Sequence, residues 1–163
     1  MKDEIRKFLQ EMSIEFEENV SLKRKTWIKR GGIASFYVLP KSSDELLVIC
    51  RFLFRNNIPF DIVGHTSNMY FLNEYDSNVF ISTKNLLGEI ETDDSFVCEA
   101  GVNVSGFSRR MSEMGDVGFE GLVGLPGTMG GAVVNNSSAF GFSILNMSID
   151  VECLNERGMV DSQ

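Results

Sequence analysis

The first half of the chain alternates between segments whose apolar residues recur at helical spacing and segments typical of strands. We expect helices over 2–12 and 42–55, and strands over 33–39, 58–63 and 78–82. Ser42 and Glu45 have the spacing of a capping box, which places the start of the second helix. A strand, a helix and a strand within about 30 residues indicate a right-handed βαβ unit, whose strands run parallel.

The second half of the chain is richer in strands. One helix is expected over 104–114, with Phe107 and Met111 facing inward and Arg109 and Arg110 facing outward. Strands are expected over 89–91, 96–100 and 149–154, with a turn at 156–158 and a partner strand that begins at 159–160. These patterns predict an α+β protein with two lobes, residues 1–85 and 86–163.

Glycine is unusually frequent near the middle of the second half. It stands at every third position from Gly115 to Gly130, and Gly131 follows. Such clustering costs conformational entropy, so it indicates sharp turns or close approaches. Collagen is excluded, because this short run holds one proline and has globular flanks. Two interpretations remain: a turn between packed elements, or a loop whose amide N–H groups surround a phosphate or a flat cofactor.

A second loop of small and polar residues follows the expected strand at 58–63, and α/β proteins place ligands at such strand ends. We name residues 63–69 loop one and residues 124–132 loop two. Neither loop matches the phosphate-loop or the G-x-G-x-x-G pattern, which disfavours a plain ATP or NAD site. Two loops from different lobes suit one long ligand, such as a flavin dinucleotide, with Thr66, Ser67 and Thr128 adding hydroxyl donors.

Composition narrows the function classes further. The formal net charge of -8 argues against broad binding to nucleic acid or to an anionic membrane. Three cysteines without a C-x-x-C pair suggest reduced thiols and a cytoplasmic protein. We expect no signal peptide, no membrane span and no metal site, since His65 is the only histidine. The basic stretch from Lys23 to Arg30 is either a solvated loop or a contact to a ligand phosphate.

Four segments, taken in order, resemble one enzyme family. They are residues 19–34, 63–68, 99–102 and 118–141, and the most distinctive block reads Gly-Leu-Pro-Gly-Thr-Met-Gly-Gly-Ala over 124–132. The family is the UDP-N-acetylenolpyruvoylglucosamine reductases, the MurB flavoenzymes of peptidoglycan synthesis, also called UDP-N-acetylmuramate dehydrogenases. The resemblance implies a two-lobed FAD-binding fold of the vanillyl-alcohol-oxidase/MurB type.

The resemblance also implies a cofactor and its binding residues. Loop one would hold the FAD pyrophosphate, loop two would line the ribityl chain and the isoalloxazine, and Gly101 would lie near the adenosine end. The implied cofactor-binding residues are Gly64, His65, Thr66, Ser67, Asn68, Met69, Gly101, Gly124, Leu125, Pro126, Gly127, Thr128, Gly130, Gly131 and Ala132. Valine at Gly130 or Gly131 is expected to abolish FAD retention and to leave the chain soluble. Family members reduce FAD with NADPH and then reduce an enolpyruvyl ether on a UDP-sugar.

The chain departs from the family pattern in three places. Thr66 stands where the family loop has its second glycine, and residues 136–141 lack one glycine and one tyrosine hydroxyl of the family. The family's catalytic Tyr-Arg pair, serine and late glutamate lie beyond the position matching Gln163. We therefore expect a C-terminally truncated fold with no substrate domain and no catalytic residue, inactive alone, whose UDP-sugar partner requires the missing part.

Three further expectations stay open at this stage. Another flavin-dependent sugar or alcohol oxidoreductase of the same fold is an alternative function. A non-catalytic relic that no longer holds FAD is a second alternative. The hairpin that begins to pair near Val160 leaves a strand edge through which the chain is expected to be able to self-associate.

Overall fold

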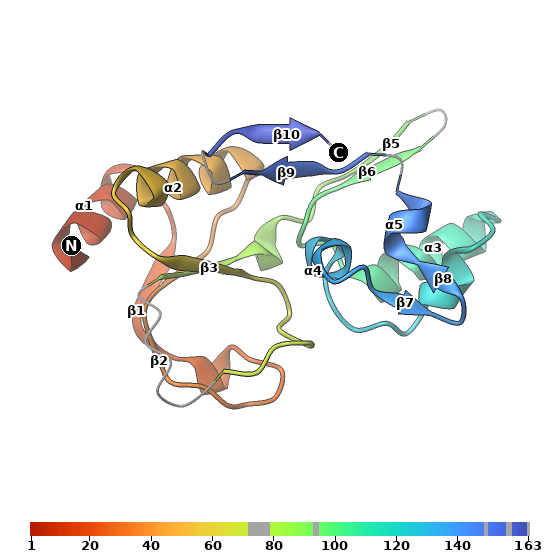
Figure 1. The fold of residues 1–163 in the computed structure, drawn as a ribbon, viewed down its shortest axis with the longest axis horizontal. Helices are drawn as coiled ribbons and strands as arrows, with labels where there is room; N and C mark the ends of the chain where they lie inside the picture. The colour runs from red at the N-terminus through yellow and green to blue at the C-terminus, as the bar shows by residue number, and fades with distance from the viewer. Residues whose placement is uncertain (72–78, 93–94, 149, 156–157, 163) are drawn as a thin grey trace.

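The protein is represented by a computed structural model that describes residues 1–71, 79–92, 95–148, 150–155 and 158–162. Figure 1 shows two groups of elements side by side, the first half of the chain in red to yellow and the second half in green to blue. The first group contains α1 (Lys2–Glu11), β1 (Phe16–Ser21), β2 (Ile33–Val38), α2 (Ser43–Arg55), β3 (Phe60–Val63) and β4 (Val79–Ser82).

The first group is built on a four-stranded sheet with the strand order β1-β2-β4-β3. β1 pairs antiparallel with β2, whereas β2 and β3 both pair parallel with β4. The parallel strands of the predicted βαβ unit are therefore present, but β4 lies between them. The capping box is also confirmed, because Ser42 Oγ accepts the Glu45 N–H at 3.2 Å and caps α2.

The two faces of this sheet bury alternate residues of the same strands. Phe36 and Val38 of β2 face α1 and α2, in a core that includes Ile5, Leu9, Ile49 and Leu53. Tyr37 packs on the opposite face, with Phe80, Phe71 and Val63. The period of two along each strand thus separates a helix-covered face from a loop-covered face.

The second group holds shorter elements. Its members are β5 (Glu89–Glu91), β6 (Phe96–Cys98), α3 (Val104–Met114), α4 (Met129–Val134), β7 (Ser138–Ala139), β8 (Phe142–Ser143) and α5 (Ile144–Met147). The α3 helix has the predicted bounds, buries Phe107 and Met111, and ends at Gly115 with a φ of 98°. α4 lies partly within a stretch that the sequence assigned to a loop, so the helical start at Met129 was missed.

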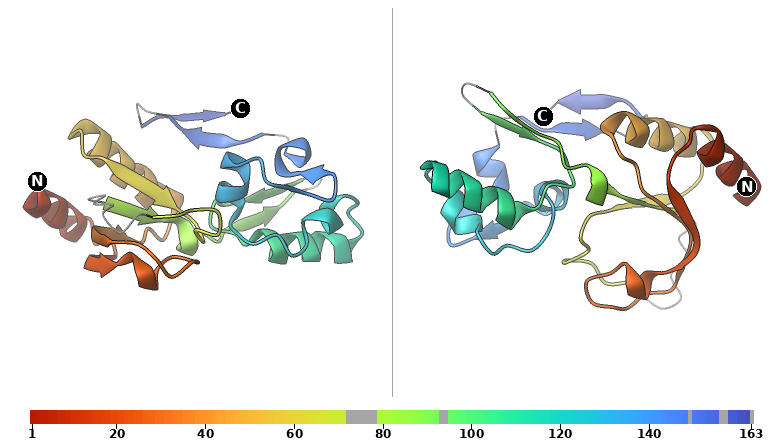
Figure 2. Two further views of the ribbon diagram at one scale, coloured as in Figure 1. Left: turned by 60° about the horizontal axis from the view of Figure 1, so that its bottom comes forward. Right: turned by 180° about the vertical axis from the view of Figure 1, so that it is seen from behind.

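The C-terminal hairpin consists of β9 (Glu152–Leu154) and β10 (Val160–Ser162), paired antiparallel as predicted. The expected positions 149, 156 and 157 lie outside the described residues. The hairpin packs over α2 of the first group, as Figures 1 and 2 show. Arg51 Nε donates a 2.8 Å hydrogen bond to the Gly158 carbonyl, and Leu154 packs against the core beneath α2. In the part of the chain that the structure describes, no helix has the length and apolar character needed to span a membrane.

Candidate functional site

The two loops that the sequence singles out lie in contact. Ser67 Oγ donates to the Pro126 carbonyl at 3.1 Å, and Asn68 Nδ2 donates to Asn135 Oδ1 at 3.2 Å. Gly64 lies so close to the Thr128 side chain that a Cβ at position 64 would overlap the hydroxyl. Loop one and loop two therefore lie side by side, and Asn68 also reaches the end of α4. Side chains at the meeting point bind the other loop, so they join the two groups of elements.

The backbone of loop one leaves several donors uncommitted. The N–H groups of His65, Thr66, Ser67 and Asn68 donate to no acceptor within the described residues, whereas Met69 N–H donates to the Thr66 carbonyl at 3.3 Å. Backbone donors left without a protein partner require water or a ligand. Consecutive amides in a turn that contains a left-handed residue form an anion-binding concavity. Loop one therefore fits the pyrophosphate of a dinucleotide.

Thr66 supplies that left-handed residue, with a φ of 56°. This conformation suits glycine, and a Cβ-bearing residue adopts it at a cost of roughly 1–2 kcal/mol. The side chain is 6% exposed, and its hydroxyl donates to the His65 carbonyl at 2.7 Å and accepts the Trp27 N–H at 2.9 Å. Position 66 thus adopts a backbone conformation that glycine favours, although a threonine occupies it.

Loop two uses most of its amides inside the protein. The N–H groups of Met129, Gly130 and Ala132 donate to the carbonyls of Val102, Ala100 and Thr128. Gly131 N–H donates to Thr128 Oγ1, which caps α4. Earlier in loop two, the N–H groups of Gly127 and Thr128 donate to no acceptor among the described residues. The N–H groups of residues 129–132 therefore bind groups of the protein, three of them carbonyls and one the Thr128 hydroxyl, and are not free to surround a ligand.

Two predicted site glycines have a packing role. A Cβ on Gly101 would overlap the Thr83 carbonyl and lie 2.6 Å from the Leu86 carbonyl. A Cβ on Gly130 would lie 2.8 Å from the Ala100 Cβ. Valine at Gly130 would therefore disturb the packing of α4, so a loss of FAD in that variant would not isolate the cofactor contact. Gly131 suits that test better, since its Cβ would lie 3.3 Å from Thr128 Oγ1 and meet nothing closer.

The other predicted positions divide by exposure. His65, Asn68 and Met69 of loop one and Gly124 and Pro126 of loop two are exposed, while Leu125 is partly buried. Ala132 is 5% exposed and belongs to a core cluster with Val104, Leu122 and Ile144. Its side chain therefore supports α4 from beneath.

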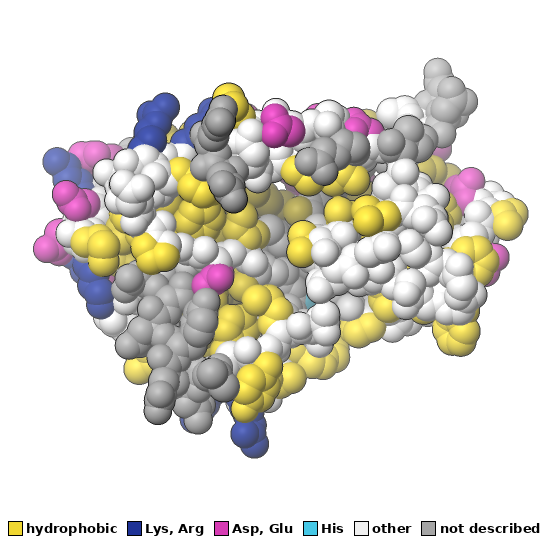
Figure 3. Space-filling model, in the orientation of Figure 1, with side chains coloured by type: hydrophobic (Ala, Val, Ile, Leu, Met, Phe, Trp, Pro, Cys, Tyr) yellow, Lys and Arg dark blue, Asp and Glu magenta, His cyan; other side chains and the backbone are white. Residues whose placement is uncertain are grey.

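The molecular surface is hollowed between the two groups of elements on the face shown in Figure 3. Hydrophobic and uncharged side chains line the hollow, and most acidic and basic side chains lie toward the rim. An apolar recess with few charges is typical of the sites that bind flat organic cofactors.

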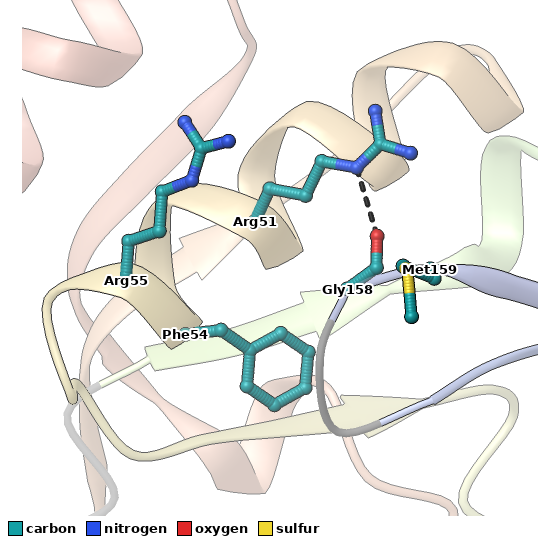
Figure 4. Close-up of a pocket in the computed structure, with 5 residues that line it drawn as sticks. All are labelled: Arg51, Phe54, Arg55, Gly158 and Met159. Carbon is teal, nitrogen blue, oxygen red and sulfur yellow. Dashed lines mark hydrogen bonds between the residues drawn. The ribbon is translucent and has the colours of Figure 1, made fainter.

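A separate pocket of about 220 Å³ lies between α2 and the C-terminal hairpin. Arg51, Phe54, Arg55, Gly158 and Met159 line it, and Figure 4 shows Arg51 reaching the Gly158 carbonyl. Its volume is below the roughly 300 Å³ at which small-molecule sites begin. None of its lining residues belongs to loop one or loop two, so the pocket is a gap under the docked hairpin.

The cysteines are unpaired, and two of them are buried enough to lose reactivity. Burial raises the pKa of the Cys50 thiol to about 12. Burial, with a smaller contribution from Glu89, also raises the pKa of Cys98. A thiol with a raised pKa holds little thiolate and is a poor nucleophile. Among the described residues, no three His, Cys, Asp or Glu side chains are placed to hold a metal ion.

Comparison with known proteins identifies the family. The family model described as FAD binding domain matches residues 34–161. The UDP-N-acetylenolpyruvoylglucosamine reductase of Carboxydothermus hydrogenoformans is 36% identical over 142 residues, which are 86% of this chain and 47% of that protein. The corresponding reductase of Caldicellulosiruptor saccharolyticus is 34% identical over 150 residues, 91% of this chain and 48% of that protein. The chain thus spans about half the length of the curated relatives it matches.

Solved structures show the same fold. The MurB reductase of Thermus caldophilus gives a TM-score of 0.69 at 23% identity and covers 92% of this chain and 52% of that one. A berberine bridge enzyme variant gives a TM-score of 0.71 at 12% identity and covers 100% of this chain and 38% of that one. These likenesses confirm the predicted α+β FAD-binding fold. The chain therefore belongs to the FAD binding domain family.

Proposed function

We propose that this chain binds FAD between loop one and loop two and serves as the cofactor-binding part of a UDP-N-acetylenolpyruvoylglucosamine reductase. In the complete enzyme NADPH would reduce the flavin, and the product would be UDP-N-acetylmuramate, made in the cytoplasm for peptidoglycan synthesis. The observation that carries the proposal is the contact between the two loops beside a row of uncommitted amides in loop one.

The residues of this chain have distinct roles in that proposal. The N–H groups of residues 65–68 hold the pyrophosphate, and those of Gly127 and Thr128 approach it from loop two. Gly131 leaves room for the cofactor beside α4, whereas Gly101 and Ala132 support the site through packing. FAD supplies the hydride chemistry when bound, and the protein supplies binding and orientation. We assign no catalytic residue to this chain, and the UDP-sugar is a partner of the complete enzyme.

The proposal is tested by titrating the purified chain with FAD and following flavin absorbance and fluorescence. Wild type is expected to bind FAD, and Gly131→Val is expected to weaken binding about tenfold or more, as an overpacking clash of 1–3 kcal/mol implies. Gly106→Val is a matched control, because Gly106 also lies in the first turn of a helix. Its N–H donates to the capping Asn103 side chain, and its Cβ would lie 3.3 Å from that cap.

Circular dichroism checks that both variants stay folded. A wild-type chain that neither carries flavin nor binds added FAD would contradict the proposal and favour the non-catalytic alternative. Equal FAD affinity in Gly131→Val and Gly106→Val would remove α4 from the cofactor site.

A further inference from the structure

Thr66 connects loop one to a second turn, which lies within the basic stretch from Lys23 to Arg30. That turn runs from Thr26 to Arg30, in the connection between β1 and β2, and Figure 1 shows this connection near the segment that follows β3. The Trp27 N–H donates to Thr66 Oγ1 at 2.9 Å. The Thr66 hydroxyl directs its own proton to the His65 carbonyl at 2.7 Å. One buried hydroxyl is therefore both donor and acceptor at the centre of loop one.

The Thr26–Arg30 turn is rigid by its own hydrogen bonds. Thr26 Oγ1 donates to the Arg30 carbonyl at 2.7 Å and accepts the Arg30 N–H at 3.2 Å, and Lys29 N–H donates to the Thr26 carbonyl at 3.2 Å. Thr26 is 2% exposed. Because these hydrogen bonds close the turn, they fix the position of the Trp27 N–H that donates to Thr66 Oγ1.

The conformation of Thr66 needs such a support. A threonine does not favour a φ of 56°, and strained residues persist only where surrounding contacts over-determine them. A glycine would reach the same φ without help, but it would also sample other conformations freely. In this chain the hydrogen bond between the Thr66 hydroxyl and the Trp27 N–H stabilises the positive φ that a glycine would adopt without such a bond.

We propose that Thr66 is a positioning residue, whose hydroxyl bond to the Trp27 amide holds loop one in the conformation that leaves the amides of residues 65–68 free for a diphosphate. The ligand in this proposal, FAD, rests on the proposed function. The same bond keeps the exposed Lys29 and Arg30 in a turn joined to loop one, and their charges favour an anion at this edge.

The test uses three substitutions that separate the hydroxyl from the shape. Thr66→Ser keeps the hydroxyl, Thr66→Val keeps the branched shape without it, and Thr66→Gly removes both the hydroxyl and the strain. The first measurement is amide hydrogen exchange of Trp27, the only tryptophan in the chain, in the FAD-free protein. Valine and glycine are expected to speed this exchange about tenfold, the effect of losing one hydrogen bond, and serine is expected to leave it near wild type.

The second measurement is FAD affinity by titration. Valine and glycine at position 66 are expected to weaken it about tenfold, and serine is expected to retain it. Unchanged Trp27 exchange in Thr66→Gly would overturn the bond itself. If Thr66→Gly speeds exchange of the Trp27 amide but leaves FAD affinity unchanged, the Thr66 hydroxyl does not position loop one. A wild-type chain that binds no FAD would refute the proposed function, and with it the positioning role, whereas Trp27 exchange would still report on the bond.

Discussion

At the scale of single residues, the glycines at every third position do not form a structural repeat. Gly115 ends α3 with a φ of 98°, whereas Gly118 reaches 108° before a short 3-10 helix. A Cβ on Gly121 would overlap the Phe142 ring, and Gly130 packs on Ala100. These glycines therefore have different structural roles, either a positive φ or a close contact, and their regular spacing does not reflect a repeated structure.

The strongest stability prediction at this scale concerns Gly101. Its Cβ would meet the carbonyls of Thr83 and Leu86, which belong to the backbone and cannot rotate away. Gly101→Ala is expected to lower the free energy of unfolding by about 3 kcal/mol, at the upper end of overpacking costs. Urea denaturation measures this. In the matched control, Gly106→Ala, the Cβ meets only side-chain atoms, those of Asn103 and Arg110, and stability is expected to change by less than about 1 kcal/mol. Equal losses in both variants would show that the backbone at position 101 can yield.

At the scale of elements, α1 is fixed to the sheet by packing and by one charged pair. Its residues Ile5 and Leu9 are buried in the core. Its Phe8 ring stacks on Phe52 of α2 with 3.9 Å between the ring centroids. Arg6 forms a two-pronged contact with Glu18 of β1, with its Nε and Nη2 at 2.7 and 2.9 Å from the two carboxylate oxygens. Bidentate geometry of this kind gives the strongest form of the ion pair.

This pair predicts a pH dependence of stability. The hydrogen bonds from Arg6 lower the pKa of the Glu18 carboxyl in the folded state. The pair therefore stabilises the fold above the unfolded pKa of about 4.3, and this contribution is lost as the pH falls through the lower folded value. Glu18→Gln is expected to be less stable than wild type at pH 7 and to match it in strong acid, by denaturation at a series of pH values.

The size of that effect is limited by solvent. The side chains of Arg6 and Glu18 are 36% and 29% exposed, so water screens their attraction. Glu11→Gln is the control, because Glu11 meets Lys7 at 3.7 Å on the open surface of α1. A Glu18→Gln curve parallel to wild type at all pH values would contradict the prediction.

At the scale of the whole molecule, several contacts join the two groups of elements, among them the hydrogen bond from Ser43 Oγ of α2 to Glu99 Oε1 at 2.8 Å. Loop one and loop two meet beside α4, and the C-terminal hairpin lies across α2. These contacts join residues far apart in the sequence, so a ligand held by both loops would stabilise both groups together.

That arrangement predicts a ligand effect on two distant segments. FAD at about 100 times its dissociation constant is expected to raise the free energy of unfolding by about 2.7 kcal/mol. Hydrogen exchange is expected to slow at residues 65–68 and also at Gly127 and Thr128, whose amides are otherwise uncommitted. The exposed strand β10 serves as the control segment and is expected to change little. Protection confined to one loop would show that the ligand does not bridge the two groups.

The sequence by itself determined most of the longer elements and a resemblance to a family. The bounds of α3, the capped start of α2, the pairing of the C-terminal hairpin and the resemblance to MurB reductases all follow from local patterns. Periodicity, caps and motifs depend on residues a few positions apart, so they can be recognised without knowledge of the fold.

Only the tertiary structure decided how those elements meet. It placed β4 between β2 and β3, laid the hairpin over α2, and paired the amides of residues 129–132 with acceptors of the protein. It also joined Thr66 to the Trp27 amide and brought Gly101 against the Thr83 carbonyl. Each of these contacts joins segments that are distant in sequence, and the local patterns at either end carry no sign of the partner. Which glycine faces a ligand and which faces the protein was therefore settled by packing.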